Sequence, residues 1–599
     1  MRIHRLVPGP LLFLLGIVTA ATNLSAAEPP LDPGSDDPAA PTELVQLAEE
    51  FRDWLSDTRS PDRVPDYGDV DREQRRGLAE YRERLDAMAD EIRGHPVPVQ
   101  VDYMVLQIEM NRLQFDLEAV RQVTRNPDFY LNEAVRRVTR HVGGRYHQGP
   151  NHITVPYDGE RAQAIIRGLD QTSEIVAQAP DLLTEAVPEM AEMTIERLDD
   201  PRSSYAEFAR VVGQHVPERY RGELTEAADR AGQALEEYRD WLVANRDGMT
   251  APWYIGRDAF DWYAQHVYVM PYDSDQLLMH AEMERNRNWA YLQMERQRNR
   301  HLPRAGGVTD VPSRSAVDND EFADWKDATD VMTREWILEH DLLEIPDYVG
   351  RIRQERSSET AAYIQPFGFM GFPTEQLEPG EKRKFVLEPD HHFENNYWNT
   401  GHRIDPGVNH PHSDIPGHTY EGRVSRATTR DLRVGHNTRG DALPFYWEHV
   451  QLQMDYPFVR GPLIREWMFG LLIMRAERVE IAVHMAAGTM TPDEVGQYML
   501  DNVPWMEPYV GIQHEVWRKF TRPVSVLDYQ VASFQVMSLL RERMQQLGDD
   551  FDFREFHHDL MATGMIPISL ARWEMTGEDD HVSHLWDTPE VPRLVEEDR

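Results

Sequence analysis

Histidine, the side chain that most often binds metal ions, is concentrated in one short stretch of this 599-residue chain. Four histidines fall within seventeen residues and three more lie nearby: His402, His410, His412 and His418, with His391, His392 and His436. The chain has no cysteine, so its metal ligands would be imidazole and carboxylate groups, which suit zinc and also iron, manganese or copper. We therefore interpret this stretch as a candidate divalent-metal site and not as an exposed loop whose histidines are incidental.

The spacing of His412 and His418 is informative because residues six apart on an unbroken helix point about 120° away from each other. The dipeptide Pro416-Gly417, immediately before His418, breaks or bends a helix. A kink at that point can bring the two imidazoles to one ion. Glu421, three residues after His418, would share its helix face.

A third ligand is expected from another helix. Asp441 and Glu448 are seven residues apart, so they lie on one face of a helix predicted from about Asp441 to Met454. Either carboxylate could reach the histidines, and the sequence leaves the choice between them open. Carboxylates on helices are more often solvated than bound to a metal, so each assignment is a hypothesis.

Around these residues the sequence resembles the bacterial domain-of-unknown-function 885 family, whose members are similar to helical zinc peptidases of the Taq carboxypeptidase and angiotensin-converting-enzyme groups. The family pattern His-Glu-x-x-Pro-Gly-His corresponds here to His412-Ser413-Asp414-Ile415-Pro416-Gly417-His418. Two flanking elements, Tyr-x-Asn-Thr and Glu-Gly-Trp-Ala-x-Tyr-x-Glu, correspond to Tyr397-Trp398-Asn399-Thr400 and Asp441-Ala442-Leu443-Pro444-Phe445-Tyr446-Trp447-Glu448. Further residues fall at the family's spacing: Arg475, Arg478, Glu515 to Tyr529, Arg541 and Phe556 to Pro567.

The resemblance implies a zinc ion held by His412, His418 and Asp441, where Asp441 replaces the family's glutamate. Such a site keeps one coordination position open for a water molecule that a general base activates. The resemblance also implies a set of residues that contact the substrate: Tyr529 and Arg478 at its reacting oxygens, and Tyr397, Trp398 and Arg541 elsewhere.

The chain departs from the family pattern at the general base, where Ser413 replaces the glutamate. A hydroxyl group does not accept a proton usefully at neutral pH, so another group would have to act. Asp414, one residue along, and Glu421 are the two candidates for this role.

These observations predict a metal-dependent hydrolase that acts on peptides or other small amide-like substrates. One alternative keeps the metal but replaces hydrolysis with a lyase reaction or with oxygen-using chemistry on a small metabolite. Another is a catalytically inactive protein that binds metal or peptide on a peptidase scaffold. Metal content and amidase activity would separate these three hypotheses.

The elements that must position these residues are mainly α-helical. From Thr42 to about Gln354, apolar residues recur at helical spacing, as in the series Leu224, Ala228, Ala231, Leu235, Tyr238 and Leu242. Between Ala361 and Gly407 aromatic, Gly and Pro residues replace that period, which predicts an irregular insertion with short strands. We expect one large helical body with a deep cleft, divided into an N-terminal half (42–356) and a metal-site half (357–599).

The N-terminus predicts export. Arg2 and Arg5 precede an apolar run from Leu11 to Ala21 and the small residues Ser25-Ala26-Ala27, a pattern typical of a signal peptide over residues 1–27 that is cleaved after Ala27. Residues 28–41 are rich in Pro, Asp and Ala, and they predict a disordered leader. Because no cysteine is present for lipid attachment, we expect a periplasmic or secreted protein without a lipid anchor.

The charge of the chain limits the class of partner. A formal net charge of -40 is spread along the sequence, which argues against nucleic acid, because phosphate binding needs a concentrated basic face. No segment after the N-terminus is apolar enough to predict a membrane anchor. The expected partner is a small-molecule or peptide substrate, and the sequence does not determine the oligomeric state.

Overall fold

The computed structural model of the protein describes residues 38–59, 63–142, 156–302, 319–356, 382–386, 405–434, 436–458, 463–503, 518–519, 522–525 and 527–594. The described residues are mainly helical, which confirms the predicted fold class. The first helix begins at Thr42, where ordered structure was predicted to start. The predicted signal peptide, most of the predicted leader, and His391, His392 and His402 lie outside the described residues.

The helices before the insertion are α1 (Thr42–Arg59), α2 (Tyr67–Asp86), α3 (Ala89–Ile92), α4 (Val97–Phe115), α5 (Gln122–Arg125), α6 (Pro127–Val142), α7 (Gly159–Val176), α8 (Ala179–Leu182), α9 (Pro188–Arg197), α10 (Pro201–Gly213), α11 (Glu218–Asn245), α12 (Arg257–His266), α13 (Ser274–Arg298) and α14 (Asn319–Glu339). The helices after it are α18 (His410–Ser413), α19 (His418–Thr428), α20 (Ala442–Gln453), α21 (Leu463–Ala487), α22 (Pro492–Asn502), α24 (Gln530–Leu547), α25 (Phe553–Ala562) and α26 (Ile568–Thr576).

Two short strands are described here: β2 (Lys382–Val386) lies within the predicted insertion, whereas β1 (Ile352–Arg356) precedes it, at the end of the stretch predicted to be helical. The strands pair in parallel, with Ile352 opposite Lys382 and Arg356 opposite Val386. A strand was predicted where β2 forms. The predicted deep cleft stays a prediction, because most of residues 357–404 lie outside the described part of the chain.

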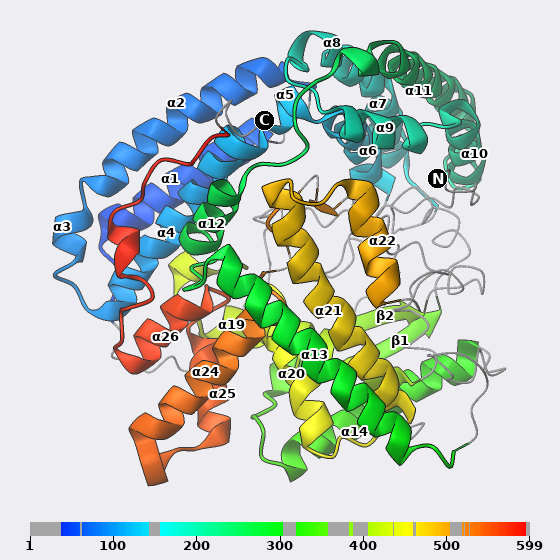
Figure 1. Ribbon diagram of the computed structural model, residues 1–599. Helices are drawn as coiled ribbons and strands as arrows, with labels where there is room; N and C mark the ends of the chain where they lie inside the picture. Colours follow the sequence, from blue (N-terminus) through cyan, green and yellow to red (C-terminus); the bar gives the residue numbers. More distant parts are fainter. Residues whose placement is uncertain are drawn as a thin grey trace.

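Helix α21 lies at the centre of the metal-site half. Nearly all of its side chains are buried, as expected for a helix that is apolar on most sides. Helix α13, from the N-terminal half, runs beside α21 and packs against it more extensively than any other two described helices do (Figure 1). The two predicted halves therefore pack directly against each other.

Sequence signals explain where several of these helices begin. Asp273 and Gln276 form a reciprocal cap at the start of α13, and Thr491 and Glu494 do the same for α22.

Helices α6, α7, α9, α10 and α11 pack together at one end of the molecule (Figure 1). Helices α18 and α19 carry His410, His412 and His418 of the histidine-rich stretch, and α18 packs against α20, which packs against α24. None of the described helices combines the length and hydropathy that a bilayer-crossing segment needs.

Candidate metal centre

The chain bends sharply between His412 and His418, as the Pro416-Gly417 step predicted. Helix α18 ends at Ser413 and α19 begins at His418, so the helix is broken over residues 414–417, where Pro416-Gly417 lies. A β-carbon at Gly417 would lie 1.8 Å from the carbonyl oxygen of His412, far closer than any side chain allows. Only glycine permits this approach of the two backbone segments, and the approach places the imidazoles side by side.

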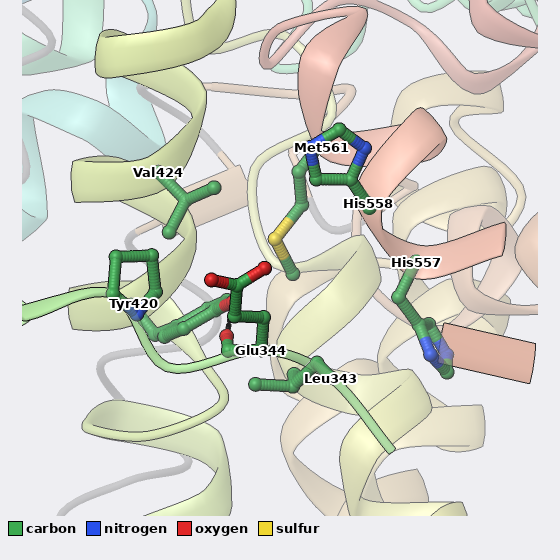
Figure 2. Close-up of a pocket in the computed structure, with 8 residues that line it drawn as sticks. Leu343, Glu344, Tyr420, Val424, His557, His558 and Met561 are labelled. Carbon is green, nitrogen blue, oxygen red and sulfur yellow. Dashed lines mark hydrogen bonds between the residues drawn. The ribbon is translucent and has the colours of Figure 1, made fainter. Parts of the chain in front are cut away.

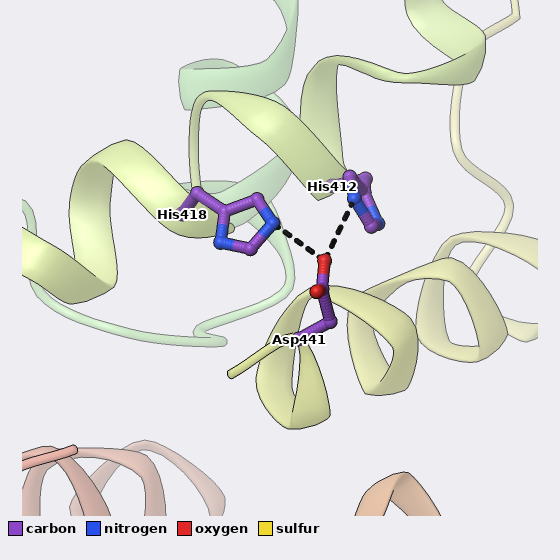
Figure 3. A group of neighbouring side chains, drawn as sticks. All are labelled: His412, His418 and Asp441. Carbon is purple, nitrogen blue, oxygen red and sulfur yellow. Dashed lines mark hydrogen bonds and ion pairs between the residues drawn. The ribbon is translucent and has the colours of Figure 1, made fainter. Parts of the chain in front are cut away.

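His412, His418 and Asp441 form a compact group of possible metal ligands (Figure 3). The Nε2 atom of His418 lies 2.7 Å from Asp441 Oδ1, and that of His412 lies 3.4 Å from the same oxygen. The two imidazole rings are nearly perpendicular, with centroids 5.0 Å apart. Burial raises the pKa of Asp441, but the two imidazoles lower it more, so it falls well below its usual value. The geometric hypothesis on which the site depended is therefore supported.

The donor set fits a tetrahedral zinc ion. Bonds of about 2.0–2.1 Å place the ligand atoms of such an ion about 3.3 Å apart. The separation of 3.4 Å between His412 Nε2 and Asp441 Oδ1 meets this requirement. The shorter contact of His418 with Asp441 is a hydrogen bond that an ion would replace by a small outward movement of the imidazole. The His418 side chain is 28% exposed, so the group can be reached from solvent.

Glu448 contacts His412 from the other side of the ring. Its Oε1 atom lies 2.8 Å from His412 Nδ1, and its other oxygen pairs with the guanidinium of Arg475. A carboxylate beside Nδ1 favours a proton on that nitrogen and leaves the lone pair of Nε2 free to face an ion, as carboxylates behind metal-binding histidines do in zinc proteins. Of the two carboxylates between which the sequence left the choice open, Asp441 groups with both histidines, and Glu448 contacts the opposite nitrogen of His412.

Aromatic packing holds this arrangement in place. The guanidinium carbon of Arg475 lies 3.7 Å from the ring centroid of Phe445. Phe445 meets His412 edge to face at 5.3 Å and stacks on Tyr529 at the same centroid distance. Phe445 therefore links the candidate ligand His412 to Tyr529, a residue predicted to contact substrate.

The two predicted general bases point away from the group. Asp414 is fully buried and pairs with His410, with 3.0 Å between its Oδ2 and Nδ1 of His410. The opposite nitrogen of His410 faces Asp330 at 3.5 Å. Glu421 is also fully buried, and its carboxylate accepts a hydrogen bond of 2.6 Å from Arg439 Nε. Both carboxylates thus have structural partners, and neither role as a base gains support.

Ser413, at the family's glutamate position, is also engaged elsewhere. Its hydroxyl accepts a hydrogen bond from the side-chain amide of Asn409, and its carbonyl accepts one from Thr419. His436, another histidine of the cluster, is buried with its Nδ1 atom 3.3 Å from Glu109. Neither residue contributes to the group of ligands.

The remaining predicted residues are spread over the surroundings of the site. Tyr529 lies in the turn before α24, at the N-cap of that helix, which begins at Gln530. Arg478 is buried on α21 one turn beyond Arg475, and Arg475 is the one that pairs with Glu448. Arg541 is exposed on α24, about 18 Å along the helix axis from Tyr529. Tyr397 and Trp398 lie outside the described residues.

Asp528 is a functional candidate that the sequence reasoning missed. A β-carbon on Gly440, next to the ligand Asp441, would lie 2.2 Å from Asp528 Oδ2, so the carboxylate packs directly on this backbone. Gly440 has a positive φ of 50°, which glycine adopts without strain. Burial and the nearby carboxylate of Asp441 raise the pKa of Asp528 to about 6. Its place immediately before Tyr529 was the only available signal in the sequence.

A small pocket near the site does not serve the metal group. It is lined by residues that include Tyr420 and Val424 of α19 and His557 and Met561 of α25 (Figure 2). Tyr420 is two residues from His418, so it projects from the opposite side of α19. Both nitrogens of His557 are engaged, one with the Tyr446 hydroxyl at 3.0 Å and the other with the Leu342 carbonyl at 2.8 Å. These contacts give His557 a structural role.

Comparisons with known proteins agree with this location. The sequence model of the family described as "Bacterial protein of unknown function (DUF885)" matches residues 405–575, a range that contains all three candidate ligands. This match confirms the predicted resemblance to that family over those residues, and the likeness to zinc peptidases stays a prediction. A comparison with the curated proteins gives no match.

Two solved structures share the fold. A candidate lipoprotein of unknown function from Shewanella oneidensis aligns with a TM-score of 0.67 and 13% identity, over 90% of this chain and 100% of its own. A candidate lipoprotein from Colwellia psychrerythraea aligns with a TM-score of 0.59 and 14% identity, over 91% of this chain and 100% of its own. At such identities the likeness concerns the fold alone.

Proposed function

We propose that this chain, which over residues 405–575 belongs to the DUF885 family, is a metal-dependent hydrolase that acts on a peptide or another small amide-like substrate. The observation that carries the proposal is the group formed by His412, His418 and Asp441, with Glu448 behind His412. Three protein ligands with partial solvent access are typical of catalytic zinc sites, whereas structural sites are closed by four ligands.

The three ligands would hold a divalent ion, and zinc suits their chemistry best. When bound, such an ion supplies Lewis acidity toward a carbonyl oxygen and makes coordinated water more acidic. Glu448 and Arg475 would keep the His412 ring in the orientation that the ion requires.

Asp528 is the group best placed to accept the proton of the attacking water. It packs on Gly440 beside the ligand Asp441, whereas Ser413, Asp414 and Glu421 are engaged with other partners. A carboxyl group whose pKa lies near 6 is suited to proton transfer close to neutral pH. A cation at the ligands would favour the ionised, proton-accepting form.

Tyr529 is placed to donate a hydrogen bond to the substrate. Its hydroxyl oxygen accepts a hydrogen bond from Arg518, so its own hydrogen remains available for another acceptor. The neighbouring guanidinium also favours negative charge on an oxygen at that position. Tyr529 would therefore stabilise the developing oxyanion.

The proposed location is outside the cytoplasm. The N-terminal pattern is typical of a signal peptide, and both structural neighbours are described as candidate lipoproteins. The chain itself has no cysteine, so lipid attachment through that residue is not part of the proposal.

The proposal is tested by metal content and activity of the mature protein, purified without chelator or immobilised nickel. We expect one zinc per chain and hydrolysis of at least one amide in a peptide panel. His418→Ala should lose both, whereas His301→Ala, at an exposed histidine just after the end of α13, should retain both. Stoichiometric zinc without turnover on any substrate would favour an inactive metal-binding protein, and bound iron or copper would favour oxygen-using chemistry.

A further inference from the structure

Helix α13 exposes apolar side chains and buries polar ones. Three of its buried residues are acids or amides: Glu284, Asn288 and Glu295. Its outward face instead carries Met279, Met283 and Met294, which are 53%, 62% and 63% exposed. Burying polar groups and exposing apolar ones both cost free energy, so the folding of a single chain does not explain the outward face of this helix.

The exposed apolar residues are concentrated on α13. Ten large apolar side chains are exposed in the described part of the chain, and four of them belong to this helix: Met279, Met283, Tyr291 and Met294. The other six are divided among three helices and one loop. Single exposed apolar residues are ordinary on a protein surface, whereas a contiguous group marks an interaction site. Methionine suits such a site because its flexible side chain adapts to a partner.

Four exposed residues form a straight seam along the outside of the helix. Met279, Met283, Ala290 and Met294 follow one another at intervals of four, seven and four residues, which keeps them within about 60° around the helix axis. We call these four residues the α13 seam. The helix has 25 residues, so it is about 37 Å long, and it lies in front of α21 in Figure 1. Apolar seams with this spacing are typical of helices that pair lengthwise.

The two ends of α13 carry opposite charges. Asp275 lies in the first turn, whereas Arg298 ends the helix and Arg300 follows it. The side chains of Asp275 and Arg298 are 78% and 65% exposed, although each pairs within the chain, with Arg257 and Glu295 respectively. Ion pairs at the surface are weak and exchange partners at little cost. Two copies of α13 therefore attract each other end to end when they run in opposite directions.

A second copy of the chain matches both the seam and the charges. In an antiparallel pair with Met279 opposite Met294 of the second copy, Met283 falls opposite Ala290. The acidic first turn of each helix then lies beside the arginines that end the other. A two-fold axis repeats every contact, so each apolar residue of the seam meets an apolar residue. A parallel pair would instead set acidic end against acidic end.

Arg287, which lies beside the middle of the seam, already has a counter-charge. Its guanidinium pairs with Glu284 of the same helix, whose carboxylate is nearly buried. The two copies of Arg287 come near each other close to the two-fold axis. Because each is paired within its own chain, they add little repulsion at the centre of the interface.

We infer that the chain forms a homodimer through the α13 seam, with the two helices antiparallel about a two-fold axis. The contact involves one helix, and each copy has a formal net charge of -40, which favours separation. We therefore expect a weak dimer with a dissociation constant of about 1–100 μM. The seam contains none of the candidate metal ligands, so the inference is independent of the proposed hydrolase function.

Sedimentation equilibrium of the full mature chain tests the inference. Protein concentrations from about 1 to about 200 μM span the expected dissociation constant. Salt at about 0.15 M screens the general repulsion between copies. We expect a reversible equilibrium between monomer and dimer, and a monomer at every concentration overturns the inference.

Methionine variants locate the interface. Met283→Glu and Met294→Glu should each weaken dimerisation by about tenfold or more, because a carboxylate would enter the apolar seam of an acidic protein. Met544→Glu, at a methionine of α24 that is 49% exposed, should leave the dissociation constant unchanged. All three side chains are exposed in the single chain, so the variants should fold, and circular dichroism checks this. Equal dissociation constants for Met283→Glu and the parent protein would remove the seam from the interface.

Charge reversal tests the antiparallel arrangement. Asp275→Arg makes both ends of α13 basic, and the double variant Arg298→Glu with Arg300→Glu makes both ends acidic. Each protein alone should dimerise about fivefold more weakly than the parent, because two symmetry-related contacts become repulsive. An equimolar mixture of the two should recover the parent affinity, since basic ends then meet acidic ends. Variants that alone dimerise as tightly as the parent, or a mixture that does not recover, contradict the antiparallel pair.

Discussion

The clearest consequence of the structure concerns Glu448, which contacts His412 without belonging to the group of three candidate ligands. Its Oε1 atom lies 2.8 Å from His412 Nδ1, and both Glu448 and Arg475 are almost fully buried. Loss of a carboxylate that holds a metal-binding histidine in this way weakens metal binding by about 10- to 100-fold in other proteins. We expect about tenfold for Glu448→Gln, which can still accept a hydrogen bond from the ring, and about 100-fold for Glu448→Ala.

The same substitution affects stability through a different partner. Removing the carboxylate breaks the ion pair that Glu448 makes with the buried guanidinium of Arg475, which lies over the Phe445 ring. Breaking a buried ion pair by removing one partner costs about 3–5 kcal/mol of unfolding free energy. The double variant Glu448→Gln with Arg475→Met removes both charges, so it should recover most of this stability while zinc affinity stays low.

The assay is competitive zinc titration with a chromophoric chelator, together with urea unfolding of the metal-free proteins. Asp441→Asn, a change in a direct ligand, serves as the reference for complete loss of the site. Zinc affinity unchanged in Glu448→Ala would refute the orienting role of Glu448. A loss as large as that of Asp441→Asn in both Glu448 variants would instead make Glu448 a ligand.

Three further predictions address the kink, the proton acceptor and the core. Gly417→Ala should lower zinc stoichiometry and cost about 3 kcal/mol or more of stability, measured by elemental analysis and urea unfolding, because its β-carbon would overlap the His412 carbonyl. Asp528→Asn should reduce kcat by about 100-fold or more while zinc remains bound; an unchanged rate removes Asp528 from the mechanism. Glu477 is fully buried beside Arg285, and its burial together with the nearby Glu480 raises its pKa from 4.5 to about 8. The folded protein therefore holds the proton of Glu477 more tightly than the unfolded chain does. As a result, the protein loses stability as pH rises from about 4.5 to about 8. Glu477→Gln should therefore raise Tm at pH 8 and leave it nearly unchanged at pH 5, and equal effects at both values would contradict the assignment.

Much of the fold could be predicted because helices are local. The apolar period of Leu224 to Leu242 depends only on neighbours three or four residues away, and the helix found there, α11, contains the whole series. The break between α18 and α19 was likewise encoded by Pro416-Gly417, whose backbone chemistry acts on adjacent residues. The absence of cysteine limits the ligand types to imidazole and carboxylate groups whatever the arrangement of the helices.

The partners of individual side chains were decided only by tertiary packing. Asp441 and Glu448 share a helix face as predicted, and both contact His412, but on different ring nitrogens. Helical spacing determines the face on which Asp441 and Glu448 lie. Which ring nitrogen of His412 each carboxylate contacts depends on how α18 packs against α20.

The proposed proton acceptor shows the same limit. Asp414 stands next to the family's catalytic position in the sequence, yet it pairs with His410, whose other nitrogen faces Asp330. Asp528, more than a hundred residues from His418 along the chain, packs beside Asp441 instead. The sequence by itself determined the helices, the kink and the two histidines, because short-range backbone geometry specifies them. The tertiary structure decided which carboxylate meets the histidines and which acid lies beside them, because long-range packing sets those distances.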